Sequence, residues 1–269
     1  MDPLIFGILF LFGIAIGSFL NVVILRYDGD HFLFDTKMLG GRSHCMHCHA
    51  TLRWFELIPI VSFIIQGGQC RRCKARLNVQ YPIIELLSGL IFAFVPVMIA
   101  AGAAPDAPIA LASALWIAAF EALLVMAMID IRLGIIPDEI NIFLSVVGVL
   151  LMVVFGWNEG TVLGRLIGGA VAGAFFAALI AITRGKGMGM GDLKLAIPLG
   201  LLFGWPDILF ALMFAFIIGA IVGVFAVARG KNTMKGTLPF GPFLALGAAT
   251  MFFLGAPILS WYFSLLGIR

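Results

Sequence analysis

The chain has 269 residues, of which 62% are apolar and only 12% are charged. A soluble domain carries roughly 25% charged residues, so this composition excludes an ordinary soluble domain and favours an integral membrane protein. The formal net charge of +3 is small, and we expect no nucleic acid partner.

Eight apolar segments are candidates to cross a bilayer, which takes about 20 residues at a rise of 1.5 Å each. They cover residues 3–25, 80–101, 108–129, 140–157, 162–183, 195–205, 207–228 and 240–266. The first lacks a basic leader and is too long for the apolar core of a signal peptide, so it predicts a retained helix. The sixth is short and contains Pro198, which fits a half-helix, a re-entrant piece or two short helices broken near Pro206. We therefore predict an all-α, polytopic bundle of about eight transmembrane helices.

The only sizeable hydrophilic piece is residues 26–79, which predicts a small cytoplasmic loop domain between a first helix (1–25) and a bundle (80–269). Two small-residue spacings, Gly13-x3-Gly17 and Gly219-x3-Gly223, permit close helix contact. They are equally explained as ordinary glycines of membrane helices. We find no convincing internal repeat, so a transporter built from inverted repeats is not supported.

All four cysteines lie in this hydrophilic piece, in two CxxC pairs, Cys45-x2-Cys48 and Cys70-x2-Cys73. Two such pairs at this separation are typical of a structural four-thiolate zinc site, because Zn²⁺ takes four ligands tetrahedrally. Two disulfides or four free thiols are the alternatives, and disulfides rarely persist in a reducing cytosol. Three histidines near the first pair are expected to be exposed or outside the ligand set: His44, His47 and His49.

The basic residues predict the orientation. With the N-terminus outside, the cytoplasmic segments are 26–79, 130–139, 184–194 and 229–239, and these hold all Lys and Arg except Arg165 and Arg269. The positive-inside rule therefore favours this topology. It also places Asp130 and Asp192 at the same cytoplasmic face, because two spans separate them.

These two aspartates lie at the mouths of apolar segments, where a carboxylate is costly and suggests function. Asp130 closes the run 111–129, and Asp192 closes a glycine-rich string in which Gly189 and Gly191 would let an extended substrate approach closely. Two carboxylates in a partly dry site share one proton. One would then activate a water while the protonated partner polarises a peptide carbonyl, which is aspartic protease chemistry.

Structural explanations compete with catalysis. Asp130 could pair with Arg132 or Lys194, and Asp192 could cap the next helix. Asp138 and Asp207 precede apolar helices and are expected to be N-terminal caps. Glu121 lies in mid-span, and the sequence indicates no role for it.

The chain resembles the type IV prepilin peptidases, which are GxGD-type membrane aspartic proteases. The resemblance runs nearly end to end. It rests on residues 17–24 with Arg26, Arg42-Ser43, the four cysteines, Ile58-Pro59, Ser62, Tyr81-Pro82, Glu85, Ile129-Asp130, Pro137-Asp138, residues 189–194 and residues 239–242.

This resemblance implies a specific activity. Members cut the basic leader from prepilins and pseudopilins at the cytoplasmic face of the inner membrane, and many then methylate the new N-terminus with S-adenosylmethionine. By the motif match, Asp130 and Asp192 are the catalytic pair. The chain departs from common members at Met46-His47, where a proline often follows the first cysteine, and at Gln69, where lysine is frequent.

Other classes of function remain as alternatives. A carboxylate-dependent ion or metal transporter predicts carboxylates near the bilayer midplane. A zinc-loop scaffold without chemistry predicts that both aspartates are dispensable. A GxGD protease with another membrane substrate differs only in what it cuts.

Overall fold

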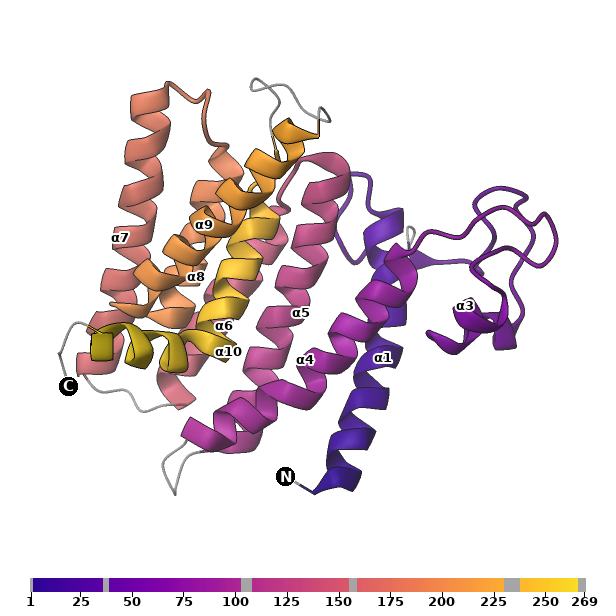
Figure 1. The fold of residues 1–269 in the computed structure, drawn as a ribbon, viewed down its shortest axis with the longest axis horizontal. Helices are drawn as coiled ribbons and strands as arrows, with labels where there is room; N and C mark the ends of the chain where they lie inside the picture. The colour runs from indigo at the N-terminus through magenta and orange to yellow at the C-terminus, as the bar shows by residue number, and fades with distance from the viewer. Residues whose placement is uncertain (1, 36–38, 103–107, 155–158, 230–237, 266–269) are drawn as a thin grey trace. The chain divides into compact units, whose positions relative to one another are not determined.

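The computed structural model describes residues 2–35, 39–102, 108–154, 159–229 and 238–265 (Figure 1). Within these ranges the regular structure is helical, apart from two isolated β-bridges. The helices are α1 (Pro3–Arg26), the 3-10 turn η1 (Trp54–Leu57), α3 (Val61–Ile65), α4 (Gln80–Gly102), α5 (Ile109–Leu133), α6 (Asp138–Val154), α7 (Glu159–Thr183), α8 (Met190–Phe203), α9 (Asp207–Ala228) and α10 (Gly241–Leu265). Each of the eight predicted segments corresponds to one helix of 14 or more residues, so the all-α class is confirmed.

Six of the described helices are long and apolar enough to cross a membrane: α1, α4, α5, α7, α9 and α10. This count of six differs slightly from the predicted eight, because α8 has only 14 residues and α6 is described over 17, up to Val154 where that described range ends. At 1.5 Å per residue α8 is about 21 Å long, shorter than a hydrocarbon core of about 30 Å. It starts at Met190 and is separated from α9 by Gly204–Pro206, so the predicted break near Pro206 is present, but only α8 is short, since α9 has 22 residues.

The chain forms two compact units, Met1–Gly102 and Ala103–Arg269. The division into first helix, loop domain and bundle that the sequence suggests stays a prediction.

In the first unit, α1 packs along α4 over small residues. A side chain on Gly13 would place its Cβ 2.7 Å from the carbonyl oxygen of Ser88, and one on Gly17 would place it 2.8 Å from the Cα of Glu85. The Ser88 hydroxyl donates to the carbonyl of Gly13 at 2.6 Å. Gly13-x3-Gly17 is therefore a close-contact motif. The nearest atoms to a Cβ on Gly219 and Gly223 lie at 3.4 and 3.9 Å, so the second spacing is not one.

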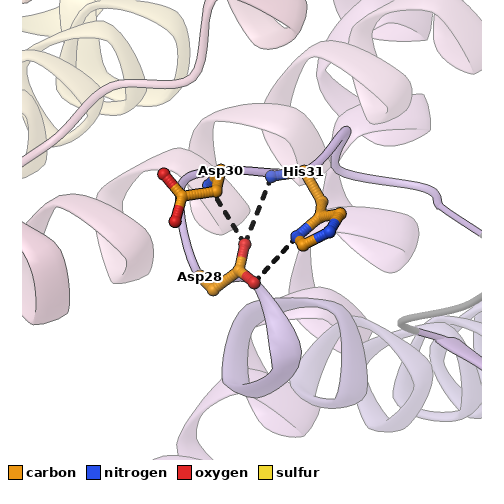
Figure 2. Close-up of polar contacts among 3 residues, drawn as sticks. All are labelled: Asp28, Asp30 and His31. Carbon is orange, nitrogen blue, oxygen red and sulfur yellow. Dashed lines mark hydrogen bonds and ion pairs between the residues drawn. The ribbon is translucent and has the colours of Figure 1, made fainter.

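Directly after α1 the chain makes an exposed polar turn (Figure 2). The Asp28 carboxylate accepts from the backbone N–H of Asp30 at 3.1 Å and from that of His31 at 3.3 Å, and it pairs with His31 Nδ1 at 2.9 Å. The N–H of Asp30 and the His31 ring lower the pKa of Asp28, and the carboxylate in turn raises the pKa of His31. The turn begins directly after Tyr27, the C-terminal cap of α1.

In the second unit, α8 packs against α6 and α7, and α10 packs against α5 and α9. Gly168 of α7 and Gly200 of α8 meet backbone to backbone, with no space for a Cβ on either. Leu195 and Leu199 of α8 are fully buried, so this short helix lies in the core. Arg165 of α7 donates to the carbonyls of Leu201 and Leu202 at 2.8 and 2.6 Å, at the end of α8.

Candidate functional site: a buried aspartate pair and a cysteine cluster

Asp130 lies one turn before the end of α5, and its side chain is only 5% exposed. The helix continues past it to Leu133 and ends at Gly134, which has a φ of 69° and whose N–H donates to the carbonyl of Asp130 at 2.8 Å. A left-handed glycine is a common way to end a helix. The backbone of Asp130 is thus fixed by regular helix on one side and by a tight cap on the other.

The Asp130 carboxylate receives a backbone donor from the other end of the unit. Oδ2 accepts from the N–H of Gly241, the first residue of α10, at 2.9 Å. Helix N-termini carry unpaired N–H groups and a partial positive charge, which suit a carboxylate. A Cβ at position 241 would lie 2.6 Å from Asp130 Oδ2 and 2.9 Å from the Met126 sulfur, so only glycine fits.

Asp192 is the third residue of α8 and is 8% exposed. Its Oδ2 accepts from the N–H of Gly189, just ahead of the helix, at 3.0 Å. Asp192 therefore also stabilises the start of its own helix, as the capping alternative expects, although from inside the first turn. A Cβ on Gly191 would lie 3.3 Å from Ile136, so this glycine also permits a close contact with the chain after α5.

The two carboxylates lie near enough for the charge of Asp192 to act on Asp130. Burial raises the pKa of Asp192, against the opposing effect of the Gly189 N–H. Each carboxylate has one oxygen, Oδ2, held by a backbone N–H. Two buried carboxyls that feel each other's charge can hold one proton between them, which is what acid–base activation of a water requires.

One of the two competing partners of Asp130 is engaged elsewhere. Lys194 pairs with Asp138 at 2.8 Å, not with Asp130. Asp138 is the first residue of α6 and Asp207 is the first residue of α9. Each therefore lies one position after the N-cap position that the sequence predicts. The Lys194–Asp138 pair is largely exposed and ties α8 to α6 at the end that carries Asp192.

The four cysteines of the first unit form a compact cluster. Their sulfurs lie within 4.8 Å of one another, with Cys45–Cys73 at 3.9 Å and Cys48–Cys70 at 4.0 Å, and none forms a disulfide. Four thiolates about 2.3 Å from one tetrahedral zinc ion would have their sulfurs roughly 3.8 Å apart. The donor set and its spacing fit a metal ion.

Both CxxC pairs are folded in the same way. Cys45 and Cys70 donate to the carbonyls of Ala50 and Ala75, and His49 and Lys74 have positive φ angles of 55° and 58°. Backbone N–H groups of Cys73 and Arg72 lower the pKa of Cys70 to about 6, which favours the thiolate that binds a metal. The three neighbouring histidines are exposed and outside the cluster, as predicted: His44, His47 and His49.

Sequence reasoning missed the role of Gly241, because nothing in its spacing relates it to Asp130. The only signal was the string Pro239-Phe240-Gly241-Pro242, quoted for its resemblance alone. It also assigned no role to two buried polar side chains of the first unit, which were quoted for their resemblance alone. Asn21 donates to the carbonyl of Tyr81 at 3.1 Å, and Glu85 accepts from the N–H of Ile60 at 2.7 Å.

Two family models match the chain, one in each unit. The bacterial peptidase A24 N-terminal domain matches residues 11–99, and the type IV leader peptidase family matches residues 116–224, which include both aspartates. No solved structure matches the chain.

Curated relatives match over nearly the whole chain. A prepilin leader peptidase/N-methyltransferase of Burkholderia pseudomallei is 33% identical over 91% of this chain and 84% of its own length. Proteins of the same name from Bacillus subtilis and Aeromonas salmonicida are 33% and 30% identical, over 95% and 97% of this chain and 97% and 94% of their own lengths. The transporter alternative is not favoured by these matches. The chain is a multi-pass membrane protein that belongs to the type IV leader peptidase family.

Proposed function

We propose that this protein is a prepilin leader peptidase of the inner membrane, in which Asp130 and Asp192 cut the leader from prepilins or pseudopilins. The observation that carries the proposal is that two buried carboxylates, each fixed by one backbone N–H, lie near enough for the charge of one to act on the other. The names of the relatives supply the substrate class.

In this mechanism one carboxylate takes a proton from a water, and the water oxygen attacks the scissile carbonyl carbon. The protonated partner donates a hydrogen bond to the carbonyl oxygen. When the intermediate collapses, the C–N bond breaks and the leaving amine takes a proton from the site. Gly189 would leave space for the extended substrate beside Asp192, whereas the space at Gly191 is taken by Ile136.

We further propose the topology that the basic residues favour, with both aspartates and the cysteine loop at the cytoplasmic face. The basic leader of the substrate then stays in the cytosol, and its apolar helix lies in the bilayer.

Zn²⁺ is the metal that the four thiolates suit best. All four ligands would be protein sulfurs, with no position left for water or substrate, so the site is structural: Cys45, Cys48, Cys70 and Cys73. It would fold a loop that has little apolar core of its own.

The relatives are also named N-methyltransferases, so we propose that the new N-terminal amine is methylated, with S-adenosylmethionine as the methyl donor. No residue of this chain is assigned to that step. The mass of the mature pilin N-terminus tests it directly.

The peptidase is tested by co-expression with a candidate prepilin. Asp130→Asn and Asp192→Asn should each abolish leader cleavage, because an amide cannot take the proton of the water. Asp28→Asn is the matched control, since it removes an exposed carboxylate from the turn after α1 and should leave cleavage unchanged. Continued cleavage by either Asp130→Asn or Asp192→Asn would contradict the mechanism.

A further inference from the structure

One surface of the first unit is far more apolar than a water-facing loop requires. Trp54 of η1 is 78% exposed, and Ile64 and Ile65 of α3 are 69% and 70% exposed. Three further exposed apolar side chains lie in the same stretch: Leu57, Ile58 and Val61. Contiguous exposed apolar surface on a folded protein marks an interaction site.

The position of this stretch relative to the helices is fixed by a buried carboxylate. Glu85 accepts from the N–H of Ile60 at 2.7 Å, and Glu85 itself is 5% exposed. Glu85 follows the first residue of α4, Gln80, by five positions, which is about 7 Å along the helix axis. Since α4 is a candidate span, Ile60 is held at the depth of the second turn of that span and not beyond its end.

The backbone turns sharply at Ile60, directly before α3 begins. Ile60 has φ 60° and ψ −53°, and the N–H of Val61 donates to the carbonyl of Pro59 at 2.5 Å, which is a γ-turn. A β-branched residue with positive φ is strained, and such strain persists only where surrounding contacts hold it. Figure 1 shows α3 level with the upper part of α1 instead of past its end.

Basic and aromatic residues flank the apolar stretch in the arrangement of a membrane interface. Arg53 precedes Trp54, and the guanidinium of Arg71 lies 5.1 Å from the centre of the Phe55 ring. Arg72 beside it is exposed. Tryptophan is enriched at the level of lipid head groups, and arginine near that level attracts anionic lipid.

We propose that residues 54–65 insert into the interfacial layer of the bilayer, so that the cysteine loop rests on lipid. Trp54 lies among the head groups, Ile64 and Ile65 lie at the top of the acyl chains, and the neighbouring arginines bind lipid phosphates. We assign lipid to this surface for two reasons. Glu85, which holds the stretch, lies within a candidate spanning helix, and arginines border the exposed apolar side chains. This contact with lipid is independent of the peptidase chemistry.

The test uses the full-length protein with Trp54 as the single tryptophan, the other four being replaced by phenylalanine, in vesicles of mixed neutral and anionic lipid. Lipids brominated near the top of the acyl chains should quench Trp54 emission roughly twofold relative to unbrominated lipid, because an interfacial segment lies 5–10 Å deep. Aqueous iodide should quench it weakly.

Two variants make the result specific. Replacing both Ile64 and Ile65 with aspartate should remove most of the quenching by lipid and expose Trp54 to iodide. Met46→Asp, which changes another exposed apolar residue of the same loop, should leave the quenching as it was. Trp54 emission that iodide quenches and brominated lipid does not would overturn the proposal. Protection from both quenchers at high lipid-to-protein ratio would assign the surface to a protein partner and overturn it as well.

Discussion

The cysteine cluster is formed by residues close together in the sequence, whereas the aspartate site is formed by residues far apart. The four cysteines lie within one loop, between residues 45 and 73, and each pair folds by contacts with its immediate neighbours. The aspartate site draws on the end of α5, the start of α8 and the start of α10, and 111 residues separate Asp130 from its backbone donor Gly241. A local site is specified by spacing, whereas a dispersed one is specified by the packing of whole helices.

The largest effect should come from the dispersed site. Gly241→Ala would put a methyl group 2.6 Å from Asp130 Oδ2, so that the carboxylate or α10 must move. Because displacement of a catalytic group by about 1 Å costs on the order of 100-fold in rate, kcat/KM for leader cleavage should fall at least that far. Gly7→Ala is the control, since nothing lies within 4 Å of a Cβ there. Wild-type cleavage by Gly241→Ala would show that the close fit of Gly241 against Asp130 is not needed for activity.

Loss of the metal site should affect the cysteine loop and not the helices. Cys70→Ser, or removal of metal with a chelator, should unfold the cysteine loop, because metal binding and folding are coupled in such loops. Trypsin should then cut at Arg71 and Arg72 at least about tenfold faster in detergent micelles. The helical content, measured by circular dichroism, should be unchanged.

Met46→Ser is the matched control for this loop, since Met46 is exposed and outside the sulfur cluster. Equal trypsin sensitivity with and without metal would mean that the loop folds without it.

The two sites should respond to pH in opposite directions. Burial raises the pKa of Asp192, so the aspartate pair keeps its shared proton above the ordinary aspartate pKa of about 3.9. Cleavage should fall as pH rises through the raised pKa, by about tenfold per unit once the proton is lost. Zinc retention should instead fall as pH falls, since thiolates are protonated. A pH–rate profile without a basic limb would contradict the shared proton.

The smallest effect is expected at the exposed turn after α1. Asp28→Asn removes the charge that raises the pKa of His31, so that pKa should return toward its ordinary value of 6.5. Titration of the imidazole by NMR measures this change. Asp30→Asn is the comparison: the charge of Asp30 also raises the pKa of His31, but without a hydrogen bond to the ring, so the change should be smaller. An unchanged His31 pKa would mean that the pair does not form.

Local patterns in the sequence predicted much of this molecule. Apolar runs predicted the eight long helices, and the spacing of the cysteines predicted their cluster, because both depend on nearby residues. The Gly13-x3-Gly17 and Gly219-x3-Gly223 spacings show the limit of this reasoning. Only the first has a partner helix close enough to need its glycines, and nothing in the two strings tells them apart.

The candidate site could be predicted only in part. The cost of a carboxylate at a membrane segment singled out Asp130 and Asp192, but the donors that hold them are main-chain groups. Every residue except proline carries a backbone N–H, so the sequence alone does not indicate which one will donate to each carboxylate. Lys194 looked like a partner for Asp130, yet the packing of α6 on α8 brings it to Asp138 instead.

Arg165 was one of two basic residues that did not fit the charge bias of the predicted topology, and the structure gives it another use. Its guanidinium binds the last carbonyls of α8, while Asp192 lies in the first turn of the same helix. A negative group at the N-terminus and a positive group at the C-terminus both oppose the dipole of a helix. The shortest of the long helices is therefore electrostatically neutralised at both ends. Arg165→Met should then loosen α8 from its far end, and so disturb Asp192 without any change at the site itself.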